Sequence, residues 1–90
     1  MLINYGRKFS KQYEKADLKI RNAFKSRLRT FKEDPNHPLL NNHSLTGEYA
    51  GYRSINVTGN WRAVFNETLD AKGDKVITFE VIGTHSQLYR

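Results

Sequence analysis

Cysteine is absent from this sequence, which excludes both disulfide bonds and thiolate metal ligands. Long apolar runs are absent as well, so no segment is predicted to span a membrane. With 90 residues and no covalent cross-link, the core must come from packing, and five Phe, five Tyr and one Trp are its main fillers. We therefore expect a single soluble domain over residues 1–90, most simply a cytoplasmic one, with no membrane contact.

The motifs of several common active sites are also missing. The sequence contains no Gly-rich phosphate loop, no paired carboxylates at helical spacing and no HExxH motif. Its three histidines, His37, His43 and His85, have neither cysteine partners nor the tight spacing of a zinc site. No metal and no cofactor is therefore predicted, and His37, which precedes Pro38, is expected to be solvated.

Acidic residues are scarce at the N-terminal end of the chain. Residues 1–32 hold ten of the fifteen Lys and Arg residues but only two acids, whereas residues 33–90 hold five cations and seven acids. A solvated helical face that keeps the protein soluble would explain part of this excess. Its one-sided distribution, within a formal net charge of +6, favours an anionic partner, which would be RNA, DNA or an acidic protein segment.

Two helical segments are predicted in this basic region. The first follows Gly6, an acceptable N-cap, and its inward face consists of Phe9, Gln12, Tyr13 and Ala16. Asp17 is a plausible N-cap for a second helix, although a single kinked helix fits the pattern too. The second segment has apolar residues at i, i+3/i+4 spacing, namely Ile20, Ala23, Phe24, Leu28 and Phe31. A basic ridge lies opposite this stripe and consists of Arg21, Lys25, Arg29 and Lys32.

Two arginines do not fit the apolar patterns around them. Arg27 projects into the apolar stripe of the second helix, where it should snorkel or pair with an acid. Arg53 lies on the core side of a predicted strand and should escape at the strand end or find a carboxylate. The second helix ends at Glu33-Asp34-Pro35, because the residue before proline is pushed out of the α region.

The remaining segments are predicted to form strands. Leu2–Tyr5 is a short apolar strand, residues 53–67 form a hairpin, and the last strand begins at Val76 with Ile77, Phe79 and Val81 on one face. This strand is expected to stop at Gly83 and to present Thr84 and His85 from its end. The predicted fold class is α+β in the order β-α-α-β-β-β, an antiparallel sheet with a helical hairpin packed on one face and the other face open.

The register of the hairpin follows from its loop. A two-residue turn at Gly59-Asn60 would set apolar Val57 opposite Arg62. A three-residue loop of Thr58, Gly59 and Asn60 instead pairs Val57 with Trp61, Asn56 with Arg62 and Ile55 with Ala63. Only the second arrangement keeps apolar residues on one face, so we predict that Asn56 and Arg62 lie side by side on the open face, near Ser54.

The open side of the sheet is then predicted to hold His43, Arg62 and His85, ringed by Tyr49, Tyr52, Trp61 and Tyr89. RNA is cut without a metal when its 2′-hydroxyl attacks the adjacent phosphate, which requires a base, an acid and a cation for the phosphorane charge. Two imidazoles and an arginine fit these roles, and aromatic rings can hold unstacked bases. Each residue alone also has a structural explanation: a strand-end His85, a core Trp61 or a surface Arg62.

Two segments resemble a known family. NHSLTGEYAGYRSINVTGNWRAVF, residues 42–65, and VIGTHSQLY, residues 81–89, are similar to the RelE/ParE toxin superfamily of type II toxin–antitoxin systems. The most similar branch is the YafQ-like, RelE/StbE-type one, in which a His-x-Leu-x-Gly element, a Gly-Tyr-Arg element and a terminal Gly-Thr-His recur. The resemblance covers essentially the whole chain. It implies a ribosome-dependent mRNA endonuclease, or mRNA interferase, that inhibits translation and is neutralised by a cognate antitoxin.

The resemblance also assigns roles to residues. His43 matches the histidine of the His-x-Leu-x-Gly element, His85 the terminal histidine, Tyr89 the aromatic after it, and Arg62 the arginine that acts on the transition state. These four are the expected catalytic residues. Substrate binding is expected from Tyr52, Arg53, Asn56, Asn60 and Trp61. The expected partners are mRNA in the ribosomal A site, ribosomal RNA held by the ridge Arg21, Lys25, Arg29 and Lys32, and an acidic antitoxin that covers the open face or displaces residues 88–90.

This chain departs from the YafQ-like pattern at two positions. Asn56 stands where the pattern has a histidine, and Asn60 where it has an aspartate. Asparagine forms hydrogen bonds but cannot shuttle a proton at neutral pH. Acid–base work would then fall on His43 and His85.

Two other functions share the predicted fold. A ParE-like toxin would inhibit DNA gyrase by binding, without nuclease chemistry. A non-catalytic RNA-binding domain would depend on the basic ridge and not on His85. The presence of both Arg62 and His85 beside an open sheet favours the nuclease.

Overall fold

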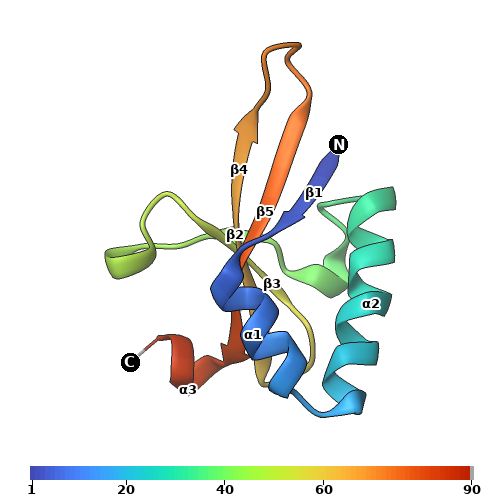
Figure 1. Cartoon of the computed structure of the whole chain (residues 1–90), viewed down its shortest axis with the longest axis vertical. Helices are drawn as coiled ribbons and strands as arrows, with labels where there is room; N and C mark the ends of the chain where they lie inside the picture. Colours follow the sequence, from blue (N-terminus) through green and yellow to red (C-terminus); the bar gives the residue numbers. More distant parts are fainter. Residues whose placement is uncertain (90) are drawn as a thin grey trace.

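The computed structural model describes residues 1–89, and Arg90 lies outside the described residues. Its elements confirm the predicted α+β class (Figure 1). In chain order they are β1 (Leu2–Tyr5), α1 (Arg7–Lys15), α2 (Leu18–Glu33), the 3-10 turn η1 (Pro38–Leu40), β2 (His43–Ser44), the 3-10 turn η2 (Gly47–Tyr49), β3 (Arg53–Asn56), β4 (Trp61–Leu69), β5 (Lys75–Thr84) and α3 (His85–Leu88). Within the described residues no helix is long and apolar enough to cross a membrane.

The five strands form one sheet in the order β1-β5-β4-β3-β2. Strands β2 to β5 are antiparallel, but β1 pairs parallel with β5, so the sheet is mixed and not antiparallel throughout. In the sequence, α1 and α2 follow β1, which is one edge strand of the sheet. The chain then enters β2, which is the opposite edge strand. Neither the parallel pairing nor the two-residue strand β2 was predicted, because apolar patterns do not specify a strand's partner.

The register of the β3–β4 hairpin is confirmed. Ile55 pairs with Ala63 and Asn56 with Arg62, and the backbone N–H of Val57 donates to the carbonyl of Trp61 at 2.9 Å. Because β3 and β4 alternate between the two faces of the sheet, this register puts Asn56 and Arg62 side by side on the face away from the helices.

The face assignment of β5 is only partly as predicted. Val64 pairs with Val81, and the next residue of β4, Phe65, pairs with Phe79. Glu80 is therefore an extra, unpaired residue in β5. Such a bulge reverses the alternation of all residues beyond it. Ile77 and Phe79 therefore pack under the helices as expected, but Val81 lies on the opposite face with Val64 and Leu88. In residues 81–84 the side chains that face each side of the sheet are therefore the reverse of those predicted.

The helical hairpin packs on the sheet through a cluster of aromatic rings. Phe79 lies at its centre, with its ring centroid 5.1–6.0 Å from those of Phe9, Phe24, Phe31 and Phe65. The chain forms two separate helices, because Ala16 and Asp17 both have extended backbone dihedrals. Ala23 and Leu28 from the predicted stripe are only partly buried.

The two misfit arginines are both half-buried. Nε of Arg53 donates a hydrogen bond to the side-chain amide oxygen of Asn42 at 2.8 Å. This amide oxygen takes the place of the predicted carboxylate. Arg27 is half-buried, and its Nε is buried without a hydrogen-bond partner.

Replacing Phe79 with alanine should lower the free energy of unfolding by about 3–5 kcal/mol, because it empties the centre of the aromatic cluster. Urea unfolding measures this loss. Leu69→Ala is the matched control in the same β4–β5 hairpin, since the Leu69 side chain is 66% exposed, and it should change the free energy by less than about 0.5 kcal/mol. Equal effects of the two substitutions would contradict the central role of Phe79.

Candidate functional site

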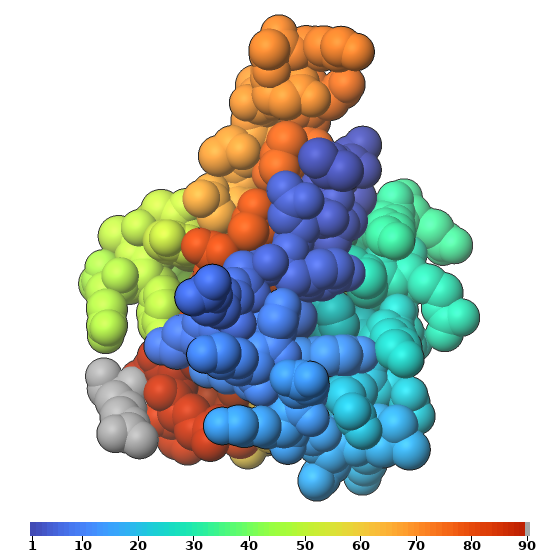
Figure 2. All heavy atoms as spheres, viewed as in Figure 1, coloured from blue at the N-terminus to red at the C-terminus, as the bar shows by residue number. Residues whose placement is uncertain are grey.

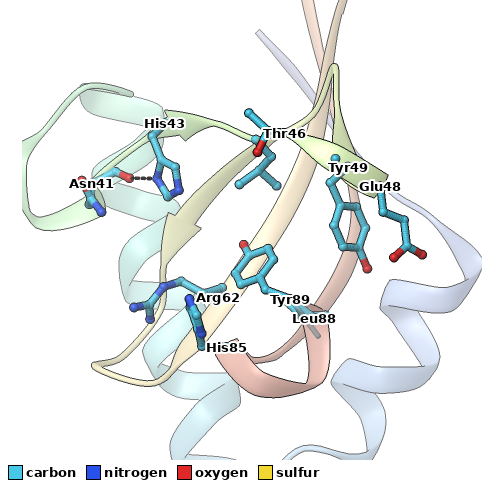
Figure 3. A pocket seen from close by; sticks show the side chains of 11 residues that line it. Asn41, His43, Thr46, Glu48, Tyr49, Arg62, His85, Leu88 and Tyr89 are labelled. Carbon is cyan, nitrogen blue, oxygen red and sulfur yellow. Dashed lines mark hydrogen bonds between the residues drawn. The ribbon is translucent and has the colours of Figure 1, made fainter.

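A hollow of about 510 Å³ opens on the face of the sheet away from the helices. Its polar walls come from three parts of the chain: His43 on β2, Arg62 on β4, and His85 with Tyr89 at the C-terminal end. Figure 3 shows Arg62 and His85 side by side, with Tyr89 next to them and His43 across the pocket. The four residues predicted to be catalytic are thus brought together, although more than forty positions separate His43 from Tyr89 in the sequence.

His43 is oriented by a backbone carbonyl. Its Nδ1 lies 2.8 Å from the carbonyl oxygen of Asn41. A carbonyl oxygen only accepts hydrogen bonds, so Nδ1 must carry the proton, and in the neutral ring Nε2 keeps its lone pair. In Figure 3 this second nitrogen points into the pocket. The arrangement suits a proton acceptor.

Asn41 adopts an unusual backbone conformation to make this contact. Its φ of 44° and ψ of 49° lie in the left-handed region, and it is the one non-glycine residue with positive φ among residues 1–89. Asparagine tolerates this region better than most residues. Sequence analysis missed Asn41, although an asparagine directly after a short turn such as η1 is typical of a left-handed C-cap.

The Arg62 guanidinium is held by the hairpin loop. Its Nη1 donates to the backbone carbonyls of Thr58, Gly59 and Trp61 at 3.0, 3.2 and 3.1 Å. A guanidinium has five N–H donors in a rigid fork, so its other donors can face an anion in the pocket. The cation is therefore oriented before any substrate arrives.

His85 begins the short helix α3. Thr84 Oγ1 accepts from the N–H of Gln87 at 3.2 Å, and Gln87 Oε1 accepts from the N–H of Thr84 at 2.8 Å, which makes a reciprocal capping box. The His85 N–H donates to the carbonyl of Asn60 at 2.8 Å, which ties the helix start to the hairpin loop. β5 continues to Thr84, one residue beyond its predicted end at Gly83. A side chain at Gly83 would meet Leu88 at 3.2 Å, so glycine lets α3 fold back on the sheet.

The Tyr89 hydroxyl is already bonded within the protein. It donates to Oγ of Ser54 at 2.9 Å, and Ser54 is completely buried. Its ring makes an edge contact with the His85 ring at 4.8 Å. Tyr89 therefore offers its ring to the pocket and anchors His85. Ser54, predicted only to lie near Asn56 and Arg62, is the residue that fixes Tyr89.

Tyr49 forms the opposite wall of the pocket. Its ring makes edge contacts with Tyr89 at 6.1 Å and Tyr52 at 6.4 Å. Burial, and then the nearby Glu48 and Tyr89, raise the pKa of Tyr49, so its phenol stays protonated and can donate a hydrogen bond. Glu48 and Tyr49 line the side of the pocket away from His43 (Figure 3).

The predicted substrate-binding residues are divided between the two faces of the sheet. Trp61 does not ring the pocket as predicted: it shares the helix-facing side of β4 with Ala63 and packs against the core there. Arg53 is on the helix-facing side as well, opposite Phe65. Tyr52 packs on the open face beside Tyr49.

The two asparagines lie near the pocket residues but contribute differently. Asn56 pairs with Arg62, and its Oδ1 is buried without a hydrogen-bond partner. Asn60 is exposed in the hairpin loop and contributes its backbone carbonyl, which accepts from His85. His37 lies outside the pocket and is not simply solvated, because its Nδ1 accepts from the Leu39 N–H at 3.1 Å.

The predicted basic ridge follows α2, away from the pocket. Lys25, Arg29 and Lys32 are exposed, while Arg21 is half-buried. Figure 1 shows α2 and the η2 loop at opposite sides of the molecule. Within residues 1–89, no three His, Asp or Glu side chains gather in a way that could hold a metal ion.

The tautomer of His43 can be tested by ¹⁵N NMR of the histidine rings at a pH where they are neutral. We expect the Nδ1–H form for His43 and the opposite Nε2–H form for His37, whose Nδ1 accepts a backbone N–H. Asn41→Gly should preserve the His43 pattern, since glycine enters the left-handed region without cost. Asn41→Val should cost about 1–2 kcal/mol of stability and mix the two His43 tautomers. An Nε2–H pattern for His43 in the wild type would contradict the assignment.

No protein-family model and no curated protein sequence matches the chain. Solved structures do match it. YafQ from E. coli strain BL21(DE3) is 28% identical, with a TM-score of 0.74 over 98% of this chain and 97% of that one. A YoeB/ParE toxin from Agrobacterium tumefaciens is 20% identical, with a TM-score of 0.75 over 94% of this chain and 99% of that one.

A third similar structure is that of a complex. The RelBE2 toxin–antitoxin complex from Mycobacterium tuberculosis matches with 14% identity and a TM-score of 0.69, over 93% of this chain and 96% of that one. At such identities the last two similarities establish the fold. With that fold, and with the YafQ identity extending over nearly its whole length, the chain is similar to toxins of the RelE/ParE superfamily.

Proposed function

We propose that this protein is the toxin of a type II toxin–antitoxin module and cuts mRNA in the ribosomal A site by attack of the 2′-hydroxyl on the adjacent phosphate. The observation that carries the proposal is the convergence of two histidines and an arginine, from β2, β4 and the start of α3, on one open pocket. The similarity to YafQ supports the toxin class.

His43 is the general base in this mechanism. Its Nε2 lone pair faces the pocket because the Asn41 carbonyl holds the proton on Nδ1. It takes the proton of the 2′-hydroxyl, and the oxygen then attacks the neighbouring phosphorus. The imidazolium that results is stabilised by the same carbonyl, since its Nδ1–H bond to Asn41 gains strength when the ring is charged.

His85, in its protonated form, is the general acid. It gives its proton to the 5′-oxygen as the P–O bond breaks, which leaves a 2′,3′-cyclic phosphate on one fragment and a 5′-hydroxyl on the other. The capping box and the Asn60 carbonyl fix its backbone, and Tyr89 fixes its ring. General acid and base groups of this kind each contribute about 10²–10⁴-fold to the rate.

Arg62 stabilises the charge that develops on the phosphorane. Its guanidinium is held by three loop carbonyls, so little reorganisation is needed when the substrate binds. Tyr49 and Tyr89 provide ring surfaces against which an unstacked base can pack. Asn56 pairs with Arg62 but cannot transfer a proton.

The basic ridge of α2, Arg21, Lys25, Arg29 and Lys32, would bind ribosomal RNA. It faces away from the pocket, so it can hold an RNA other than the substrate. Loss of its charges should therefore weaken delivery to the ribosome in a salt-dependent manner. The antitoxin would be acidic, to match the net charge of +6, and structures of a DinJ–YafQ complex and of RelBE2 support a protein partner of this kind.

Primer extension on an mRNA translated in a purified system tests the proposal. The wild type should give discrete cuts within ribosome-bound codons, and His43→Gln and His85→Gln should each lower the cleavage rate by about 10²–10⁴-fold, because glutamine cannot transfer the proton. His37→Asn is the matched control. It replaces the remaining histidine with a residue that can still cap η1, and it should cut like the wild type.

Uncut mRNA with the folded wild type would contradict the interferase and direct the next assay to DNA gyrase supercoiling. Equal activity of His85→Gln and the wild type, combined with loss of activity when Arg21, Lys25 and Arg29 are neutralised, would instead favour a non-catalytic RNA-binding domain.

Antitoxin binding makes a separate prediction. If the antitoxin covers the open face or displaces the end of the chain, Arg62→Ala and His85→Ala should weaken the complex, and hydrogen exchange at residues 85–89 should change on binding. Arg90 belongs to this predicted segment but lies outside the described residues. Unchanged affinity of both variants, without any change in exchange at residues 85–89, would contradict this binding mode.

A further inference from the structure

A second hollow of about 430 Å³ lies between α1, α3 and the start of β4. Lys8 and Lys15 line it from α1, Trp61 from β4, and Gln87 from α3. None of its lining residues is acidic. Figure 2 shows α1 directly beside the C-terminal helix on one face of the molecule. We refer to this hollow as the α1–α3 groove.

The groove adjoins the pocket that holds the two histidines. Tyr49 and Leu88 line both hollows, so an extended ligand in the pocket can continue past Tyr49 into the groove. A third hollow also borders Tyr49 and Lys8, but there Glu48 and Glu80 offset the charges of Arg7 and Lys8. The charge pattern therefore favours the α1–α3 groove as the path for a polyanion.

The polar groups of the groove are hydrogen-bond donors. Lys8 and Lys15 are exposed and lie two helical turns apart, about 10 Å along the axis of α1. The amide oxygen of Gln12 accepts from the Ile82 N–H at 2.9 Å, and that of Gln87 accepts from the Thr84 N–H at 2.8 Å. Because both amide oxygens are bonded in this way, each glutamine has its NH₂ group left to donate to a ligand.

Trp61 adds an aromatic surface to these donors. It is half-buried, packs against the helix-side core and lines the groove. Ammonium groups that follow a backbone, together with a ring on which a base can stack, are the combination that binds single-stranded nucleic acid without sequence preference. Stacking on a base in the groove would explain why Trp61, an aromatic residue predicted near the substrate, lies outside the catalytic pocket.

We propose that the α1–α3 groove is a subsite for the single-stranded RNA that flanks the scissile bond. Lys8 and Lys15 bind its phosphates, and Trp61 stacks on a base. The identity of the substrate rests on the proposed function, but binding to the groove does not require cleavage and can be measured separately.

The fluorescence of Trp61 provides the measurement, since the chain contains a single tryptophan. The probe is a fully 2′-O-methylated hexanucleotide, which lacks the attacking hydroxyl and cannot be cut. We expect it to quench Trp61 fluorescence on binding. A 2′-O-methylated dinucleotide, which is long enough only for the pocket, should quench far less at equal saturation.

Lysine variants then test the phosphate contacts. Each phosphate contact to a single strand makes the slope of log K against log salt more negative by about 0.7. At 0.1 M salt this contact raises the affinity about fivefold relative to 1 M salt. Lys8→Ala/Lys15→Ala should therefore weaken hexanucleotide binding about 25-fold and reduce the slope by about 1.4. Lys19→Ala/Lys72→Ala is the matched control, because it removes the same charge from two exposed lysines outside the groove. It should keep wild-type quenching and weaken binding far less.

Two results would overturn the subsite: an unchanged Trp61 signal with saturating hexanucleotide, or equal loss of affinity in the two double variants. The outcome is separable from that of the proposed function. Quenching that depends on Lys8 and Lys15 would support the subsite even if translated mRNA remained uncut, and cleavage by a protein without such quenching would reject the subsite alone.

Discussion

The pairing of the start of β4 with the end of β5 is the interaction on which the site depends. It sets Arg62 opposite Gly83 and Trp61 opposite Thr84, and the Asn60 carbonyl extends it by one more bond to His85. His85 and Arg62 are neighbours because the backbones of the two strands are hydrogen-bonded. The bulge at Glu80 completes this arrangement, since without it the residues beyond would keep the alternation of Ile77 and Phe79 and present their opposite faces to the pocket.

Backbone carbonyls hold each of the three polar groups of the site. Asn41 orients His43, the hairpin loop holds Arg62, and Asn60 positions His85. Carbonyl oxygens are acceptors that do not titrate, so they hold the His43 ring, the Arg62 guanidinium and the His85 backbone across the pH range in which histidine changes charge. An acidic residue in the same positions would also orient these groups but would repel the phosphate of the proposed substrate. Backbone carbonyls can therefore orient these groups without opposing the binding of the proposed anionic substrate.

Much of this arrangement was predictable from the sequence, for identifiable reasons. Apolar spacing predicted α1 and α2, and the requirement that apolar residues share a face predicted the register that places Asn56 beside Arg62. The parallel partner of β1 and the bulge in β5 were not predictable, because both depend on contacts between distant segments. Trp61 shows the limit most clearly: its parity in β4 placed it with Ala63, yet it was expected to ring the open side with the other substrate-binding residues. The open-face prediction was wrong, but a substrate that extends past α3 could still reach Trp61.

The two asparagines that depart from the YafQ-like pattern have unequal consequences. The backbone carbonyl of Asn60 accepts from the N–H of His85. Because any residue would supply that carbonyl, the hydrogen bond between the hairpin loop and α3 does not depend on whether position 60 is asparagine or aspartate. The change also removes a negative charge next to the phosphate path. Asn56 is different, because its side chain lies beside Arg62 with Oδ1 buried and unbonded. A buried amide oxygen without a donor is costly unless a ligand or solvent supplies one. Because Asn56 also does not line the pocket, the proposed mechanism leaves proton transfer to the two histidines that do.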